Sequence, residues 1–273
     1  MRIGTTTFGF RYSFMDPANS PQLAEVIRQA REAGVERLQV CENTRPLEMS
    51  KGDWQEARRC AAELGVDIQL GCKTLRAETV ERYLQLAQEL GCTELRIVTE
   101  EPPEHGTRQS VSALLEAIVP RMQRLGIRLA VENHFDIASA LLRELASAYP
   151  ASDVGFCVDT ANSLRSIESA REVLNLLGER AYCYHLKDYR VVGSLISFSV
   201  VGAPLGEGDL DLDACLRTIL KREPVPPLYV ETWTPTEENR ERDIALEADW
   251  LRRSVENLRE RLRKRKLSGM AES

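Results

Sequence analysis

Four short apolar stretches of the chain each end in a side chain that can bind a metal ion. Glu132 follows the run IRLAV, Asp159 follows VGFCV and Glu231 follows LYV, while His185 lies near the end of AYCYHLKD. One such carboxylate alone could be a helix cap or a solvated loop residue. Three carboxylates and one imidazole together favour a divalent cation, with Mn²⁺ as the first choice and Mg²⁺, Co²⁺ or Zn²⁺ as alternatives. Because no cysteine occupies these positions, a structural zinc site is disfavoured.

Further polar residues accompany these four. In a strand, side chains alternate between two faces, so Lys187 is expected on the side of His185, and Asp188 on the other side. Lys187 could therefore hold a substrate oxygen, although an exposed lysine at a strand end is the alternative. By the same alternation His134 lies on the side of Glu132, where it contacts either the substrate or a neighbouring loop. Arg190, shortly after the lysine, is a further candidate substrate contact.

The elements that must position these residues alternate along the chain. Eight short apolar runs are typical of strands, and apolar residues recur every three or four positions between them, as in helices that end at a glycine. Expected helix caps are Ser20 and Asp53. The eight strand-like runs cover residues 1–7, 36–42, 67–73, 94–100, 127–133, 154–160, 181–188 and 227–233.

This alternation predicts an α/β fold with a parallel sheet, and eight units close most simply into a single-domain (β/α)8 barrel. A doubly wound open sheet is the second choice, but no glycine-rich phosphate turn follows any strand. We expect the barrel to span residues 1–263, followed by a C-terminal tail over 264–273. In a barrel the carboxyl ends of the strands form the active-site mouth, which would gather the four ligands.

The segment 189–212, between the last two strands, is unusually long. It is expected to be either a lid over the substrate or an ordinary surface hairpin.

Composition narrows the class of protein. The chain has 273 residues, 43% of them hydrophobic, and a net charge of −6, so nucleic acid is not expected as a partner. Seven cysteines without a CxxC pair indicate a reducing compartment. The N-terminal residues do not resemble a signal peptide and no run is apolar enough to cross a membrane, which predicts a cytoplasmic protein without a membrane partner.

Five motifs carry a family resemblance: VENH at 131–134, DTAN at 159–162, HLKD at 185–188, GEGD at 206–209 and VETW at 230–233. Together they resemble the xylose isomerase-like TIM barrels, a superfamily of sugar phosphate isomerases and epimerases. The resemblance implies that Glu132, Asp159, His185 and Glu231 bind one divalent metal ion. It further implies that the two glutamates are catalytic, one removing the proton beside a carbonyl and the other returning it on the opposite face.

One position departs from the pattern. Many members of the superfamily carry a histidine three residues after the aspartate, and here that position is Asn162. An amide can bind a substrate hydroxyl, so Asn162 is expected to contact the substrate, but it cannot take up a proton at neutral pH.

The predicted function is a metal-dependent isomerase or epimerase of carbohydrate metabolism, acting on a keto-sugar, inosose or related polyol through a metal-bound enediolate. The alternative is a lyase resembling inosose dehydratase. An endonuclease IV-type repair enzyme is disfavoured because the chain has three histidines, and a non-catalytic sugar-binding barrel because all four ligands are present. Many relatives form dimers or tetramers, so a homo-oligomer is compatible with the resemblance.

Overall fold

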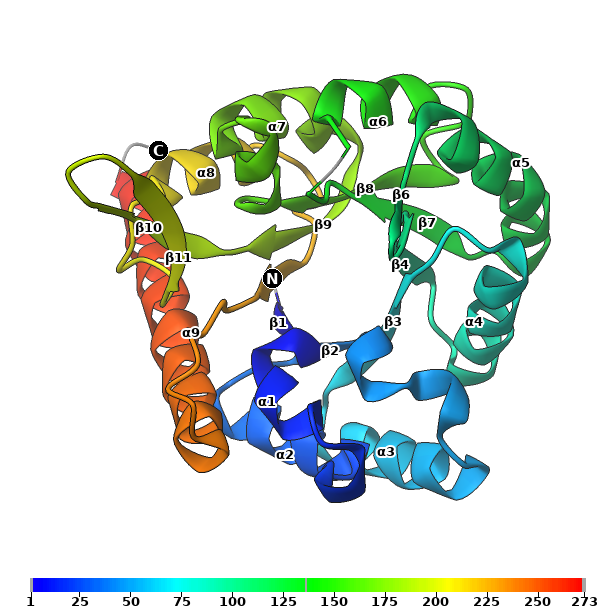
Figure 1. Cartoon of the computed structure of the whole chain (residues 1–273), viewed down its shortest axis with the longest axis horizontal. Coiled ribbons are helices and arrows are strands. Elements are labelled where there is room, and N and C mark those ends of the chain that lie inside the picture. The colour runs from blue at the N-terminus through cyan, green and yellow to red at the C-terminus, as the bar shows by residue number, and fades with distance from the viewer. Residues whose placement is uncertain (1, 136, 272–273) are drawn as a thin grey trace.

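A closed barrel of parallel strands forms the centre of the molecule (Figure 1). The computed structural model describes residues 2–135 and 137–271, and within them eight strands pair in the order β1-β12-β9-β8-β7-β4-β3-β2. Each predicted strand supplies one barrel strand, so the predicted fold is confirmed. The barrel strands are β1 (Ile3–Thr6), β2 (Arg37–Val40), β3 (Asp67–Lys73), β4 (Glu94–Val98), β7 (Arg128–Glu132), β8 (Val154–Asp159), β9 (Ala181–Leu186) and β12 (Leu228–Val230).

Helices surround the barrel on the outside (Figure 1). Their apolar stripes face the strands, as in α7, where Val173, Leu174 and Leu177 are buried. Glycines in the left-handed conformation end α3, α4 and α5, as the sequence predicts. The helices are α1 (Arg11–Phe14), α2 (Leu23–Glu32), α3 (Lys51–Leu64), α4 (Ala77–Leu90), α5 (Arg108–Leu125), α6 (Ser139–Ala146), α7 (Ala170–Leu177), α8 (Leu212–Ile219) and α9 (Arg240–Ala271).

Two of the expected helix caps are wrong. The residue that caps α2 is Gln22 and not Ser20. The cap of α3 is Ser50, whose hydroxyl accepts the N–H of Asp53, while the Asp53 carboxylate accepts the N–H of Ser50. Asp53 is therefore the third helical residue of a reciprocal capping box, which satisfies two N–H groups where a single cap satisfies one.

The long segment after β9 is a two-stranded hairpin, made of β10 (Asp188–Gly193) and β11 (Phe198–Ala203). In Figure 1 it lies beside α8 and α9 and points outward, away from the centre of the barrel. Of the two expectations for this segment, the surface hairpin is the one that the structure shows. A second, shorter hairpin of β5 (Glu100–Glu101) and β6 (Glu104–His105) follows β4.

The GEGD turn is held in place by the last residue of the HLKD motif. The buried Asp188 carboxylate accepts the backbone N–H groups of Gly206, Gly208 and Leu210 at 2.7–3.0 Å. A Cβ on Gly208 would lie 2.2 Å from Asp188 Oδ1, so the turn can approach the carboxylate this closely only with glycine there. The alternation predicted for the motif is therefore seen, with Asp188 directed away from the side of Lys187.

The last helix includes most of the expected C-terminal tail. Helix α9 continues to Ala271, and residues 272–273 lie outside the described part. Over the described residues, none of the helices combines the length and the apolar character that crossing a membrane would require.

Helix α9 also buries the carboxyl group of Glu247, and this burial can be tested through the pH dependence of stability. Glu247 is 2% exposed and accepts the backbone N–H of Tyr12. Burial raises the pKa of Glu247 to about 8, even though Arg11 acts in the opposite direction. Between its ordinary pKa of 4.5 and about 8, the folded chain thus holds a proton that the unfolded chain releases.

We therefore expect this group to lower the free energy of unfolding as the pH rises from 4.5 to 8, by up to about 1.4 kcal/mol per pH unit. Glu247→Gln keeps an acceptor for Tyr12 and should remove this slope, so that the variant is more stable than the wild type at pH 8. Denaturant unfolding at several pH values measures the slope, with the exposed Glu241→Gln as control. Equal slopes for the wild type and Glu247→Gln would contradict the prediction.

Candidate metal centre

The four predicted ligands converge at one end of the barrel. They lie at the carboxyl ends of β7, β8, β9 and β12, which are consecutive strands around the barrel. His185 Nδ1 is 3.5 Å from Glu132 Oε2, 3.9 Å from Asp159 Oδ2 and 3.2 Å from Glu231 Oε2. All four side chains are buried. We call these four residues the ligand cluster.

Two atoms of the ligand cluster indicate that it suits a cation. Within the described part of the chain, Asp159 Oδ2 and His185 Nδ1 are buried and make no hydrogen bond, although Lys187 Nζ lies 3.1 Å from the first and Glu231 Oε2 lies 3.2 Å from the second. Donor atoms of Glu132, Asp159 and His185 lie within 4.8 Å of one another. Buried polar atoms are normally satisfied, and carboxylate oxygens with one imidazole nitrogen suit a divalent cation. The residues present therefore fit such an ion.

Hydrogen bonding at the far side of the ring directs His185 toward the carboxylates. Its Nε2 lies 3.1 Å from Gln39 Oε1, and Tyr229 packs edge-on against the ring. A proton on Nε2 that is donated to Gln39 leaves the Nδ1 lone pair for a metal ion. Burial would lower the pKa of His185, but Glu132 and Glu231 outweigh it and raise the pKa above its ordinary value. A cation and a proton therefore compete for Nδ1.

Lys187 and Asn162 complete the cluster on one side. Lys187 Nζ lies 2.6 Å from Glu231 Oε1 and 3.1 Å from Asp159 Oδ2, and it donates to Asn162 Oδ1 at 3.0 Å. The Asn162 amide in turn donates to Glu132 Oε1 at 2.8 Å. Lys187 is only 3% exposed, so it is not the exposed strand-end lysine that was the alternative expectation. These two residues link the glutamates on opposite sides of His185.

Positive charges hold both glutamates in the ionised form. Burial would raise the pKa of Glu132, but Arg96 and His185 outweigh it, and the pKa lies below its ordinary value. Burial is likewise outweighed at Glu231, where Lys187 and His185 hold the pKa well below the usual range. Both carboxylates are therefore strong candidates for metal ligands. Their low pKa also makes them weak bases. Asp159 has its pKa raised, because burial there outweighs the attraction of Lys187.

Arg96 on β4 also belongs to the site, because it pairs with Glu132. Its buried guanidinium donates from Nε to Glu132, and its Nη1 lies 3.3 Å from Glu42. Sequence reasoning missed Gln39 and Asn133. Gln39 is a polar side chain at a buried position of β2, and Asn133 is a buried polar side chain directly after β7, which is the signal that could have identified them.

The remaining two candidates lie apart from this network. His134 Nδ1 is 2.5 Å from Glu100, and Lys73 pairs with the same carboxylate at 2.8 Å. Arg190 is exposed on the hairpin and donates to the backbone oxygen of Glu207 in the GEGD turn. The structure therefore assigns Arg190 to the turn, because β10 leaves the barrel sheet directly after Lys187.

Comparison with known proteins identifies the class. The chain belongs to the xylose isomerase-like TIM barrel family, whose model matches residues 27–254. Among curated relatives is a 3-oxo-isoapionate decarboxylase of Pectobacterium atrosepticum, which is 27% identical over 261 residues and aligns with 94% of this chain and 95% of its own.

Solved structures establish the same fold. One, an L-ribulose 3-epimerase, has a TM-score of 0.73 at 13% identity, covering 100% of this chain and 98% of its own. Another, a xylose isomerase-like barrel of Mycobacterium smegmatis in complex with magnesium, has a TM-score of 0.67 at 17% identity, covering 92% of this chain and 97% of its own.

Asn133 holds the backbone of Asp159 in place, so changing it tests whether the ligand cluster binds a metal ion. Its side chain accepts the backbone N–H of Asp159 at 2.8 Å and donates to the backbone oxygen of Asp159 at 3.0 Å. Losing such supporting contacts typically costs about 10–100-fold in metal affinity. We expect Asn133→Ala to weaken Mn²⁺ binding by that factor in calorimetry. The surface amide change Asn175→Ala is the control, and unchanged affinity in Asn133→Ala would show that Asn133 is not needed to position Asp159 for the ion.

Proposed function

We propose that the chain is a divalent-metal-dependent enzyme that converts a small polyhydroxy carbonyl compound through an enediolate. The observation that carries the proposal is the ligand cluster, in which Asp159 Oδ2 and His185 Nδ1 make no hydrogen bond within the described residues and Lys187 lies beside the carboxylates. Glu132, Asp159, His185 and Glu231 would hold the cation, with Mn²⁺ as our first choice. When bound, such an ion polarises a carbonyl and stabilises negative charge on its oxygen.

Within this class we propose decarboxylation of a 3-oxo sugar acid as the reaction. The bond between the carboxylate carbon and its neighbour breaks, its electron pair forms the enediolate, carbon dioxide leaves, and the carbon takes up one proton. No carboxylate base is needed for the first step. This suits a site in which Arg96 and Lys187 hold both glutamates as weak bases. The decarboxylase among the relatives supports the same choice.

Each residue beside the cluster has a role in this reaction. Lys187 carries a buried positive charge that would hold the developing enediolate oxygen or return the proton to carbon. The Asn162 carbonyl oxygen accepts from Lys187 and so fixes the direction of the ammonium group. Burial of the whole cluster excludes water, which strengthens these interactions.

Epimerisation is the second candidate function. It is favoured by Glu132 and Glu231, which come from β7 and β12, with β8 and β9 between them, and both approach His185. Two carboxylates on different sides of one site could remove a proton from one face of a carbon and return it on the other. The enediolate is common to both reactions.

One assay separates the two functions. We would incubate the Mn²⁺-loaded protein in D₂O with 3-oxo sugar acids labelled with ¹³C in the carboxyl group, and with ketoses and inososes. Decarboxylation should release labelled carbon dioxide and leave one deuterium in the product, and chelation of the metal should stop it. Deuterium exchange with a new epimer and without carbon dioxide would favour the epimerase. A protein that does neither with any substrate, although it binds Mn²⁺, would contradict the proposed chemistry.

The glutamates give a further test once a substrate is known. Glu132→Gln and Glu231→Gln remove a negative charge from the cluster and should each lower turnover by about 10²–10⁴-fold if these groups also transfer protons. The fold should remain, since both lie at strand ends, and thermal unfolding checks this. The exposed Glu179→Gln serves as the matched control. Near-normal turnover in either variant would remove that glutamate from the mechanism.

A further inference from the structure

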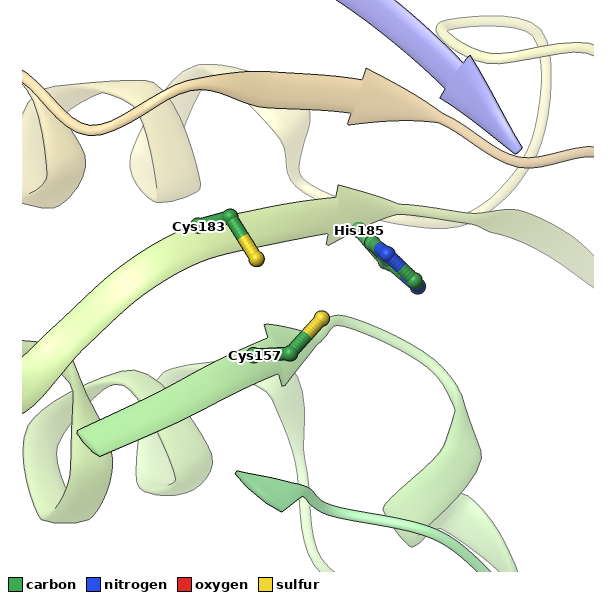
Figure 2. A group of neighbouring side chains, drawn as sticks. All are labelled: Cys157, Cys183 and His185. Atoms are coloured by element: carbon green, nitrogen blue, oxygen red, sulfur yellow. The ribbon is translucent and has the colours of Figure 1, made fainter. Parts of the chain in front are cut away.

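A second group of side chains that could hold a metal ion shares His185 with the ligand cluster and adds two cysteines. Cys157 on β8 and Cys183 on β9 are paired in register across the two neighbouring strands. Because side chains alternate along a strand, Cys157 shares a face with Asp159, and Cys183 shares one with His185. Figure 2 shows the two sulfurs turned toward each other across the gap between the strands, with the His185 ring beside them.

The geometry of this group is compatible with a bound ion. All three residues are 0% exposed, and one donor atom from each of Cys157, Cys183 and His185 lies within 4.8 Å of the others. His185 Nδ1 is buried without a hydrogen-bond partner in the described part of the chain. The two cysteines also belong to a small apolar cluster inside the barrel, separate from the main core, together with Ala130, Tyr182 and Tyr229.

We propose that Cys157, Cys183 and His185 form a second site, for a thiophilic cation such as Cd²⁺ or Zn²⁺, and that this site competes with the ligand cluster for His185. A donor set of two thiolates and one imidazole binds such thiophilic ions in preference to Mn²⁺ or Mg²⁺. Binding releases the two thiol protons, so a divalent cation and two thiolates together carry no net charge. A neutral complex avoids the cost of placing an isolated charge in the barrel interior.

The shared histidine makes the two sites antagonistic. His185 Nε2 is already engaged by Gln39, which leaves Nδ1 as the one ring nitrogen available in this arrangement. An ion held by the sulfurs and Nδ1 therefore removes a nitrogen ligand from the carboxylates above. A thiophilic ion would weaken Mn²⁺ binding in the ligand cluster without needing to occupy it.

Cadmium is the probe for this inference, and no enzymatic turnover is needed. Cd²⁺ added to the Mn²⁺-loaded protein should produce the ultraviolet charge-transfer band of a cadmium–thiolate bond and release Mn²⁺, detected by electron paramagnetic resonance. In Cys157→Ala/Cys183→Ala the band should be lost, and Mn²⁺ should be bound as in the wild type. Cys215→Ala, which removes a buried cysteine of α8, should keep the band.

Several outcomes would overturn the proposal. Binding of Cd²⁺ without the band would place the ion among the carboxylates only. A band that persists in the double variant, or that disappears in Cys215→Ala, would place it at other cysteines. Should the double alanine variant fold poorly by circular dichroism, Cys183→Ser gives the same comparison with a smaller change in shape. Since the readouts are binding signals, their failure is distinct from failure of the proposed reaction.

Discussion

The placement of three carboxyl groups inside a barrel, two of them held in the ionised form, is the constraint on which the rest of the site depends. Glu132, Asp159 and Glu231 are each at most 5% exposed, and isolated charges in such surroundings are strongly disfavoured. Lys187 and Arg96 supply the compensating charge, and both are themselves buried. Two other polar groups near the cluster follow from this balance: Gln39 orients the His185 ring, and Asn162 contacts both Lys187 and Glu132.

The supporting groups come from strands distributed around the barrel. Gln39 on β2 orients the ring of His185, and Thr6 on β1 donates to Glu231 Oε2 at 2.8 Å. Asn133, just after β7, fixes the backbone at Asp159. A closed barrel allows this because its interior side chains reach across to strands that are distant in sequence. The ligand cluster is therefore a product of the closed sheet as a whole and not only of the four strands that carry it.

Much of this arrangement could be predicted from the sequence. The eight strands are recognisable because each is a short apolar run between amphipathic helices, and the four candidate ligands because each lies at or near the end of such a run. Lys187 could be placed by alternation from His185.

Other features could not be predicted from the sequence. The role of Arg96 depends on an ion pair with a residue 36 positions away, on the neighbouring strand. Arg190 lies on β10, which belongs to a different sheet from the barrel strands, so the sequence could not show that its guanidinium binds the GEGD turn. The cap of α3 depends on a local hydrogen bond that Ser50 or Asp53 could have made, and Gln22 begins α2 without any side-chain capping bond.

The attachment of the GEGD turn to Asp188 has a consequence for how this barrel can diversify. The hairpin of β10 and β11 begins at Asp188 and returns to a turn that the same carboxylate binds, so both ends of the excursion are fastened at one point. The tip of the hairpin beyond the Val191–Val200 pair is separated from Lys187 by this attachment, whereas Gly202 at its base packs against Trp233, whose ring centroid lies 5.4 Å from Lys187 Nζ. Evolution or an engineer could replace the tip as a module, altering what the surface recognises, while the base must keep its contacts beside the charged centre.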